Sequence, residues 1–342
     1  MCRKRILRNK ADAHCLIFHG VALLAYGSAF WIYLHPQRAH IDGLWSMTAF
    51  IAASVIMLGW VSGIDVPVNF HNHSHKPLFT VPWLNRWVGR LWTFSGGWPS
   101  FFFEHAHVTV HHANLLGRGD WTLPYRRPDG GFESQARYSL THWPWRFGRY
   151  FWRDFTASDR PPGLASKALR EFLIFFALWS IPFWINIRMA LLLWVLPQWF
   201  GNVLISGAGM YLQHAGCVPK STEHPYGHSN ISLSPVLNFT MFNVGYHAHH
   251  HEYSRVHWAQ LPRLHEHMRR KLNVQRARVF RVGYYSMSST LARAWLSAEA
   301  RDARIPRHPE FATDAAGVIE PFELAGPRDY LNRHGEPREI AR

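Results

Sequence analysis

Cysteine is scarce in this chain, and acidic residues are far fewer than basic ones. The 342 residues include three cysteines, which form no C-x-x-C pair and no regular spacing: Cys2, Cys15 and Cys217. This pattern argues against a disulfide framework and indicates a reducing compartment for the part of the chain that carries chemistry. The 22 Asp and Glu stand against 37 Lys and Arg, so the formal net charge is +15.

A positive charge of this size is typical of proteins that bind nucleic acid or an anionic membrane surface. No nucleic-acid-binding motif is present, so no nucleic-acid partner is expected. The 17 Trp and 23 Phe accompany long apolar runs, a combination that favours the membrane.

Charged residues are absent from four long stretches, which we predict to be transmembrane helices. These candidate spans cover residues 15–34, 44–64, 172–187 and 189–213. About 20 apolar residues in a helix cross a hydrocarbon core of roughly 30 Å. The third span is short, but tilt or a snorkelling Arg170 can extend it. The alternative, buried helices of a soluble protein, is disfavoured because charge-free runs of this length are rare outside membranes.

The basic N-terminus predicts the orientation of the spans. The basic start and the apolar run after it resemble a signal peptide, but the run has 20 residues and no small-residue cleavage site follows it, so we expect a retained helix. Five basic residues precede it, and the positive-inside rule places them in the cytoplasm: Arg3, Lys4, Arg5, Arg8 and Lys10. An even number of spans then places both termini and residues 65–170 and 214–342 in the cytoplasm as well.

Histidine is abundant and clustered within these predicted cytoplasmic regions. The clusters read H-N-H-S-H at 71–75, H-A-H-V-T-V-H-H at 105–112 and H-A-H-H-H at 247–251. Residues three or four apart lie on one face of a helix, as ligands of one metal ion should. That spacing selects eight candidate ligands: His71, His75, His107, His111, His112, His247, His250 and His251. We expect His73 and His249 to point away from the metal and to tolerate substitution, and His105 is ambiguous.

A ninth ligand is expected near the end of the fourth span. His214 ends that span, where a helix fixes its position at the membrane surface. His228 competes for the role, but it lies in a stretch with Pro225, Gly227 and Ser229, residues typical of loops, and a loop places a ligand less tightly. We therefore favour His214.

The number of histidines indicates two metal ions. All-nitrogen ligation without thiolate suits Fe, Zn, Cu or Ni. Nine imidazoles are too many for one tetrahedral zinc, and zinc has no redox chemistry for attack on an inert C–H bond. Iron therefore fits an oxidative reaction at a C–H bond best, although the sequence alone does not exclude zinc.

The three clusters resemble the histidine boxes of the membrane fatty acid desaturase superfamily. The matching residues are His71 and His75, then His107 with His111-His112, then His247 with His250-His251, the last within N-V-G-Y-H-A-H-H-H-E-Y. The resemblance covers about residues 55–270. The second box is one residue longer than the commoner form, so either His105 or His107 can fill its first position.

The resemblance implies an all-α integral membrane protein with about four transmembrane helices and a cytosolic helical cap that holds a di-metal histidine site. It implies two Fe ions, O2 as co-substrate and an acyl lipid or another long apolar substrate. Because no H-P-G-G motif of cytochrome b5 occurs, electrons should come from a separate ferredoxin or cytochrome b5 with its reductase. We expect a desaturase-like domain over residues 1–285 and a polar C-terminal tail over 286–342.

Three other functions fit parts of the pattern. Lipid hydroxylases and carotenoid ketolases share these boxes, and H-S-N-I-S-L-S-P at 228–235 resembles the stretch before the third box in ketolases. A metal transporter or sensor would place ionisable ligands within the spans, whereas nearly all histidines of the clusters lie outside them. A catalytically inactive scaffold would have lost box histidines, and none is lost.

Overall fold

The computed structural model describes residues 6–116, 120–122, 134–215, 217, 226–274, 279–280 and 283. Within these residues the chain is almost entirely helical, which confirms the predicted all-α class. The only strands described, β1 (Ile231–Ser232) and β2 (Val279–Phe280), pair in parallel. The predicted tail at 286–342 lies outside the described residues.

The chain divides into two compact units. Unit 1 comprises Met1–Phe103 and Ser166–Ser206, and unit 2 comprises Glu104–Ala165 and Gly207–Arg342. Four helices are long and apolar enough to cross a membrane: Asp12–Leu34, Leu44–His75, Leu164–Ile185 and Ile187–His214. They confirm the four predicted spans.

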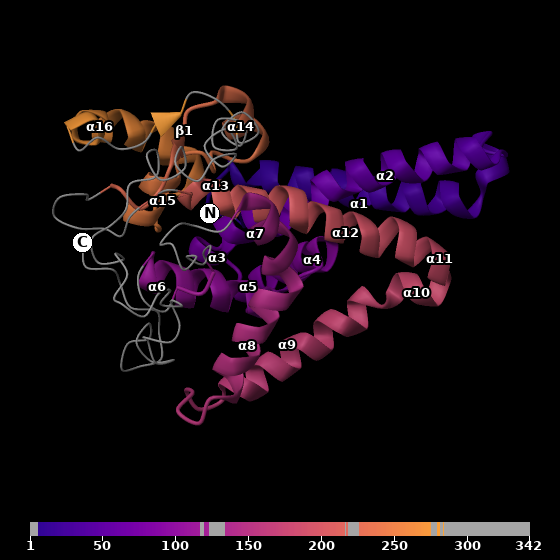
Figure 1. Cartoon of the computed structure of the whole chain (residues 1–342), viewed down its shortest axis with the longest axis horizontal. Helices are drawn as coiled ribbons and strands as arrows, with labels where there is room; N and C mark the ends of the chain where they lie inside the picture. Colours follow the sequence, from indigo (N-terminus) through magenta and orange to yellow (C-terminus); the bar gives the residue numbers. More distant parts are fainter. Residues whose placement is uncertain are drawn as a thin grey trace, which may run out of the picture. The chain divides into compact units, whose positions relative to one another are not determined.

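Unit 1 begins with an antiparallel pair of helices. Helices α1 (Asp12–Leu34) and α2 (Leu44–Ile64) lie side by side in Figure 1, joined through the 3-10 turn η1 (Pro36–Ala39). The second helix does not end at Ile64. It continues through a π-helical segment, η2 (Asp65–Phe70), into α3 (His71–His75), which carries the first histidine cluster.

The rest of unit 1 consists of shorter helices and most of the third and fourth spans, Leu164–Ile185 and Ile187–His214. Helix α4 (Pro82–Gly96) starts with a proline in its first turn and ends at Gly97, whose φ of 76° closes the helix in the left-handed conformation. The remaining segments, as bounded in the structure, are α5 (Ser100–Glu104), α9 (Leu164–Trp179), α10 (Ile181–Ile185), α11 (Ile187–Ala190), η5 (Leu191–Val195), α12 (Leu196–Gly201) and η6 (Asn202–Gly207). Asn186 separates α10 from α11, and its side chain accepts a hydrogen bond from the Met189 amide.

Glycines allow α2 and α12 to pack at very short range. A Cβ atom built on Gly201 would lie 2.2 Å from the carbonyl oxygen of Gly59 and 2.8 Å from the amide nitrogen of Gly63. Any side chain at this position would therefore push the two backbones apart. Close approach through small residues is a common way for membrane helices to associate.

A buried carboxylate lies at the start of the π-helical segment of unit 1. Asp65 is fully buried and accepts hydrogen bonds from Ser95 Oγ of α4 at 2.6 Å and from Asn69 Nδ2 at 3.0 Å. His19 Nδ1 of α1 lies 2.9 Å from the same carboxylate. A charge at this depth is tolerated only with such partners. These contacts explain why the helix continues past Asp65 although a charge interrupts the apolar run there.

Unit 2 consists of short helices. Their bounds are η3 (His105–His111), α6 (His112–Asn114), α7 (Gln135–Thr141), η4 (His142–Arg146), α8 (Phe147–Thr156), α13 (Ala208–His214), α14 (Pro235–Thr240), α15 (His247–Glu252), η7 (Trp258–Gln260) and α16 (Leu261–Val274). Buried apolar side chains hold them together in two clusters, one around Tyr138 and Tyr211 and one around Ala248 and Met268. The second and third histidine clusters both lie in this unit.

Candidate metal centre

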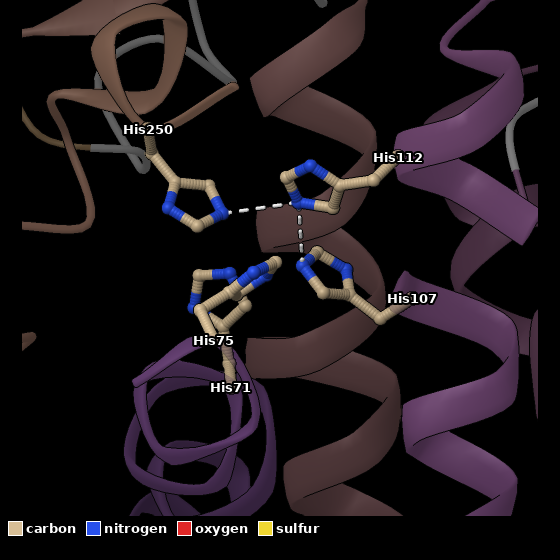
Figure 2. A group of neighbouring side chains, drawn as sticks. All are labelled: His71, His75, His107, His112 and His250. Atoms are coloured by element: carbon tan, nitrogen blue, oxygen red, sulfur yellow. Dashed lines mark hydrogen bonds between the residues drawn. The ribbon is translucent and has the colours of Figure 1, made fainter. Parts of the chain in front are cut away.

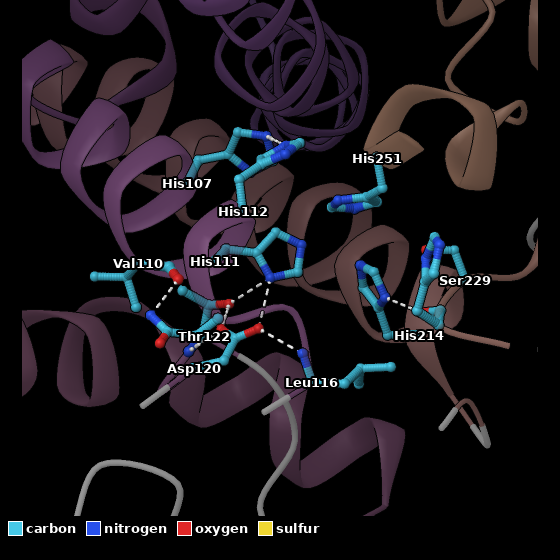
Figure 3. A network of polar contacts seen from close by, with 12 residues as sticks. His107, Val110, His111, His112, Leu116, Asp120, Thr122, His214, Ser229 and His251 are labelled. Carbon is cyan, nitrogen blue, oxygen red and sulfur yellow. Dashed lines mark hydrogen bonds and ion pairs between the residues drawn. The ribbon is translucent and has the colours of Figure 1, made fainter. Parts of the chain in front are cut away.

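Four buried histidines of unit 2 point their ring nitrogens at one another. One potential ligand atom of each lies within 4.8 Å of those of the others, and we call these residues the His111 group: His111, His214, His247 and His251. His247 Nε2 lies 3.0 Å from His214 Nε2 and 3.0 Å from His251 Nε2. Figure 3 shows the rings of His111, His214 and His251 turned towards a common space.

Three further histidines of unit 2 form a second set, the His107 group: His107, His112 and His250. His112 Nε2 lies 3.1 Å from His107 Nε2 and 3.1 Å from His250 Nε2, as the dashed lines of Figure 2 show. His111 and His112 are consecutive, and their rings are turned 80° to each other. The adjacent pair therefore contributes one residue to each group.

Two of these rings are oriented by hydrogen bonds on their outer side. The Nδ1–H of His111 donates to Asp120 Oδ2 at 2.8 Å (Figure 3). The Nδ1–H of His214 donates to the carbonyl oxygen of His228 at 2.8 Å. A neutral ring that carries its proton on Nδ1 keeps a lone pair on Nε2, which is the usual arrangement around metal-bound histidine.

Burial favours the neutral form of His251. It lowers the pKa of His251 well below its usual value, and the neighbouring His112 and His247 lower it further. The Nε2 atoms of His112 and His247 each lie within 3.1 Å of two other Nε2 atoms, so potential ligand atoms converge in each group. A metal ion within each group could bind these nitrogens, and an all-imidazole donor set suits iron, zinc, copper or nickel. The residues of both groups therefore fit a metal.

The first histidine cluster lies in unit 1. His71 and His75 are one turn apart on α3, and their ring centroids are separated by 5.1 Å, so both rings share a face as the spacing predicts. Their role as ligands rests on the sequence pattern and stays a prediction.

The remaining clustered histidines have other partners. His73 bonds to Asn85, His105 to Asp154 and His249 to His265. The ring of His228 is within hydrogen-bond distance of two side chains: its Nδ1 lies 2.8 Å from Ser229 Oγ, and its Nε2 lies 3.0 Å from Glu252 Oε1. His228 belongs to neither group. Of the two histidines left open in the second cluster, the structure thus places His107 in a group and His105 outside it.

Sequence reasoning missed the residues that orient the rings. Asp120 and Asp154 belong to no motif, and each approaches its histidine across a turn or from another helix. Asp120 lies within ten residues of the second box, and this short distance in the sequence is the only local signal that could have suggested its role.

Comparison with known proteins gives matches that agree with this geometry. Residues 43–283 match the model of the fatty acid desaturase family. A protein named sphingolipid delta(4)-desaturase DES1-like, from Oryza sativa subsp. japonica, is 25% identical over 208 residues. That match spans 57% of this chain and 57% of the rice protein, so the chain corresponds to little more than half of that relative's length.

Proposed function

Because this chain belongs to the fatty acid desaturase family, we propose that it is a membrane enzyme that desaturates a long acyl chain with O2 and two iron ions. One observation carries the proposal. Seven buried histidines of unit 2 converge in two adjoining sets, joined through the consecutive His111 and His112. Such a pair of sets matches two metal ions.

The proposed ligands are the nine histidines selected from the sequence. The His111 group would hold one ion and the His107 group the other, and the sequence pattern supports His71 and His75 as further ligands. Iron, when bound, would supply the redox chemistry needed to remove hydrogen from an unactivated methylene. Desaturation converts two adjacent CH2 groups to CH=CH and reduces O2 to two waters, which requires two electrons and two protons from outside.

The chain's own residues prepare the site in two ways. Asp120 and the carbonyl of His228 fix the Nδ1–H tautomers of His111 and His214, so that each Nε2 faces inward. Burial of the rings excludes water, which would otherwise compete for ligand positions. Substitution of a residue that orients a ligand ring in this way typically lowers metal affinity by about 10–100-fold.

The substrate, donor and orientation are part of the proposal. The rice relative is named for a sphingolipid, which supports an acyl chain within a lipid as substrate. Electrons would come from a separate ferredoxin or cytochrome b5 type protein. The basic N-terminus supports a cytoplasmic location of both termini and of the site.

Expression in a host that lacks the activity, followed by lipid mass spectrometry, tests the proposal. We expect a product two mass units lighter than its parent lipid, and no such product from a His250→Ala variant. A product sixteen units heavier would instead identify a hydroxylase. Unchanged lipids in the presence of a suitable reductase would refute the proposed enzyme.

A further inference from the structure

Each histidine cluster contains one buried histidine that faces away from the proposed ligands: His73, His105 and His249. Each bonds to a partner on a different helix. We propose that these three residues, the tether histidines, are positioning residues that hold the ligand-bearing segments against α4, α8 and α16. Their effect on metal binding rests on the proposed function, whereas their effect on the metal-free fold does not.

His73 fastens the first cluster to α4. Its Nε2–H donates to the carbonyl oxygen of Asn85 at 3.0 Å, and its Nδ1 accepts from the Leu78 amide at 3.4 Å. The Asn85 side chain in turn bonds to both the amide and the carbonyl of Phe79, at 2.8 and 3.0 Å. The ring therefore closes the loop between α3 and α4, and both of its nitrogens are occupied.

His105 fastens the second cluster to α8. Its Nε2–H donates to Asp154 Oδ2 at 2.9 Å, and both side chains are buried. Asp154 also accepts from Trp121 Nε1 at 3.2 Å and pairs with Arg153. A buried carboxylate needs such partners to compensate its desolvation, and His105 supplies one of them. The bond is thus integral to the packing of η3 on α8.

His249 fastens the third cluster to α16. Its Nε2 lies 3.0 Å from His265 Nδ1, and the Tyr246 ring packs against both imidazoles at centroid distances of 5.7 and 5.5 Å. His249 has no exposed surface, although the helical spacing turns it away from the His111 group.

The three tethers matter because each lies at a place where its helix defines ligand positions weakly. The α15 helix has six residues, too few to be stable in isolation, so neighbouring elements must define where its side chains point. The α3 segment is the last part of the helix Leu44–His75, and η3 is π-helical, so contacts with α4 and α8 fix the rings there. Each tether lies within two residues of a proposed ligand. Loss of a tether should therefore shift ligand rings as well as weaken packing.

Matched substitutions within each cluster test the proposal. Each tether histidine is changed to Phe, which keeps a ring, and to Gln, which keeps a hydrogen-bonding side chain. The ligand controls are His75→Phe, His107→Phe and His250→Phe. For each purified full-length variant, loaded with Fe²⁺, we would measure the iron retained against a graded series of chelator concentrations. We would also measure the unfolding temperature of the metal-free protein in detergent.

We expect the tether Phe variants to lower the metal-free unfolding temperature and to weaken iron retention about tenfold, as for other residues that orient ligands. The Gln variants should recover most of both. The ligand variants should lose iron while their metal-free unfolding temperature stays at the wild-type value.

Two results would overturn the tether role: wild-type iron retention in the Phe variants, or Gln variants no better than Phe. Iron loss without a change in the metal-free unfolding temperature would show that the tethers are ligands instead. Iron retained by all three ligand controls would refute the proposed metal site, while the metal-free unfolding temperatures would still decide the tethers.

Discussion

His214 Nε2 lies 3.0 Å from His247 Nε2, whereas His228 turns its ring to Ser229 and Glu252 and gives only its backbone carbonyl to His214. The two histidines that compete for the ninth ligand position therefore have different surroundings. His214 faces the other imidazoles of the His111 group, and His228 lies behind it.

This arrangement predicts different effects of two alanine substitutions. His214→Ala should lose part of the iron and nearly all turnover, because it removes an imidazole from the His111 group. His228→Ala should keep its iron, because the carbonyl that orients His214 remains. Iron analysis of both purified variants decides the matter, and full iron in His214→Ala with loss in His228→Ala would reverse the assignment.

The packing of α2 on α12 predicts a strong effect of a small substitution. Gly201→Ala places a methyl group against the Gly59 carbonyl, so we expect it to lower the free energy of unfolding by about 1–3 kcal/mol, the usual cost of overpacking. Gly27→Ala in α1 is the matched control, since nothing lies within 4 Å of the added Cβ. Thermal unfolding in detergent compares the two, and equal stability of both variants would contradict the close packing.

Burial of His142 predicts that unit 2 loses stability in acid. The ring stacks on Tyr138, its Nδ1–H donates to the Ser139 carbonyl at 2.9 Å, and burial lowers its pKa from 6.5 to about 4. Above pH 6.5 both the folded and unfolded states hold a neutral ring. Below it the unfolded state binds the proton first, so stability falls between pH 6.5 and about 4 and then levels off.

The pKa difference corresponds to about 3 kcal/mol. His142→Asn keeps a donor near the Nδ1 position but does not titrate. Denaturant unfolding of metal-free protein at pH 7 and pH 4 should show a smaller loss in the variant than in the wild type. An identical loss in both would mean that His142 does not have this depressed pKa.

The proposed topology predicts opposite labelling of two exposed positions. Gln37 lies in the turn between α1 and α2, and Ser134 precedes α7. In a Cys2→Ser background, where Cys15 and Cys217 are buried, a cysteine at Gln37 should react with an impermeant reagent in intact cells. A cysteine at Ser134 should react only after lysis. Labelling of Ser134 in intact cells would invert the orientation.

The sequence predicts the spans well and the arrangement of the histidines in part, because both depend on local periodicity. Apolar runs mark the four helices, and i, i+4 spacing places His247 and His251 on a common face. The same spacing would pair His107 with His111, but the structure brings His107 to His112, five residues along, because η3 is π-helical and its hydrogen bonds join residues five apart.

What the sequence did not predict depends on contacts between distant residues. Asp65 suggests the end of a span, yet His19 and Ser95, 46 and 30 residues away, satisfy its carboxylate and let the helix continue to His75. Periodicity also shows that His73 and His249 point away from the ligands, which suggests tolerance to substitution. Their burial and their bonds to Asn85 and His265 lead us to expect a larger effect instead.

Metal analysis of the purified chain tests the central claim most directly. The protein, isolated in detergent after expression with iron and zinc both available, should contain close to two irons per chain and little zinc, because two sets of buried imidazoles are present. The His250→Ala variant should contain less iron. One zinc per chain without iron would contradict the di-iron account.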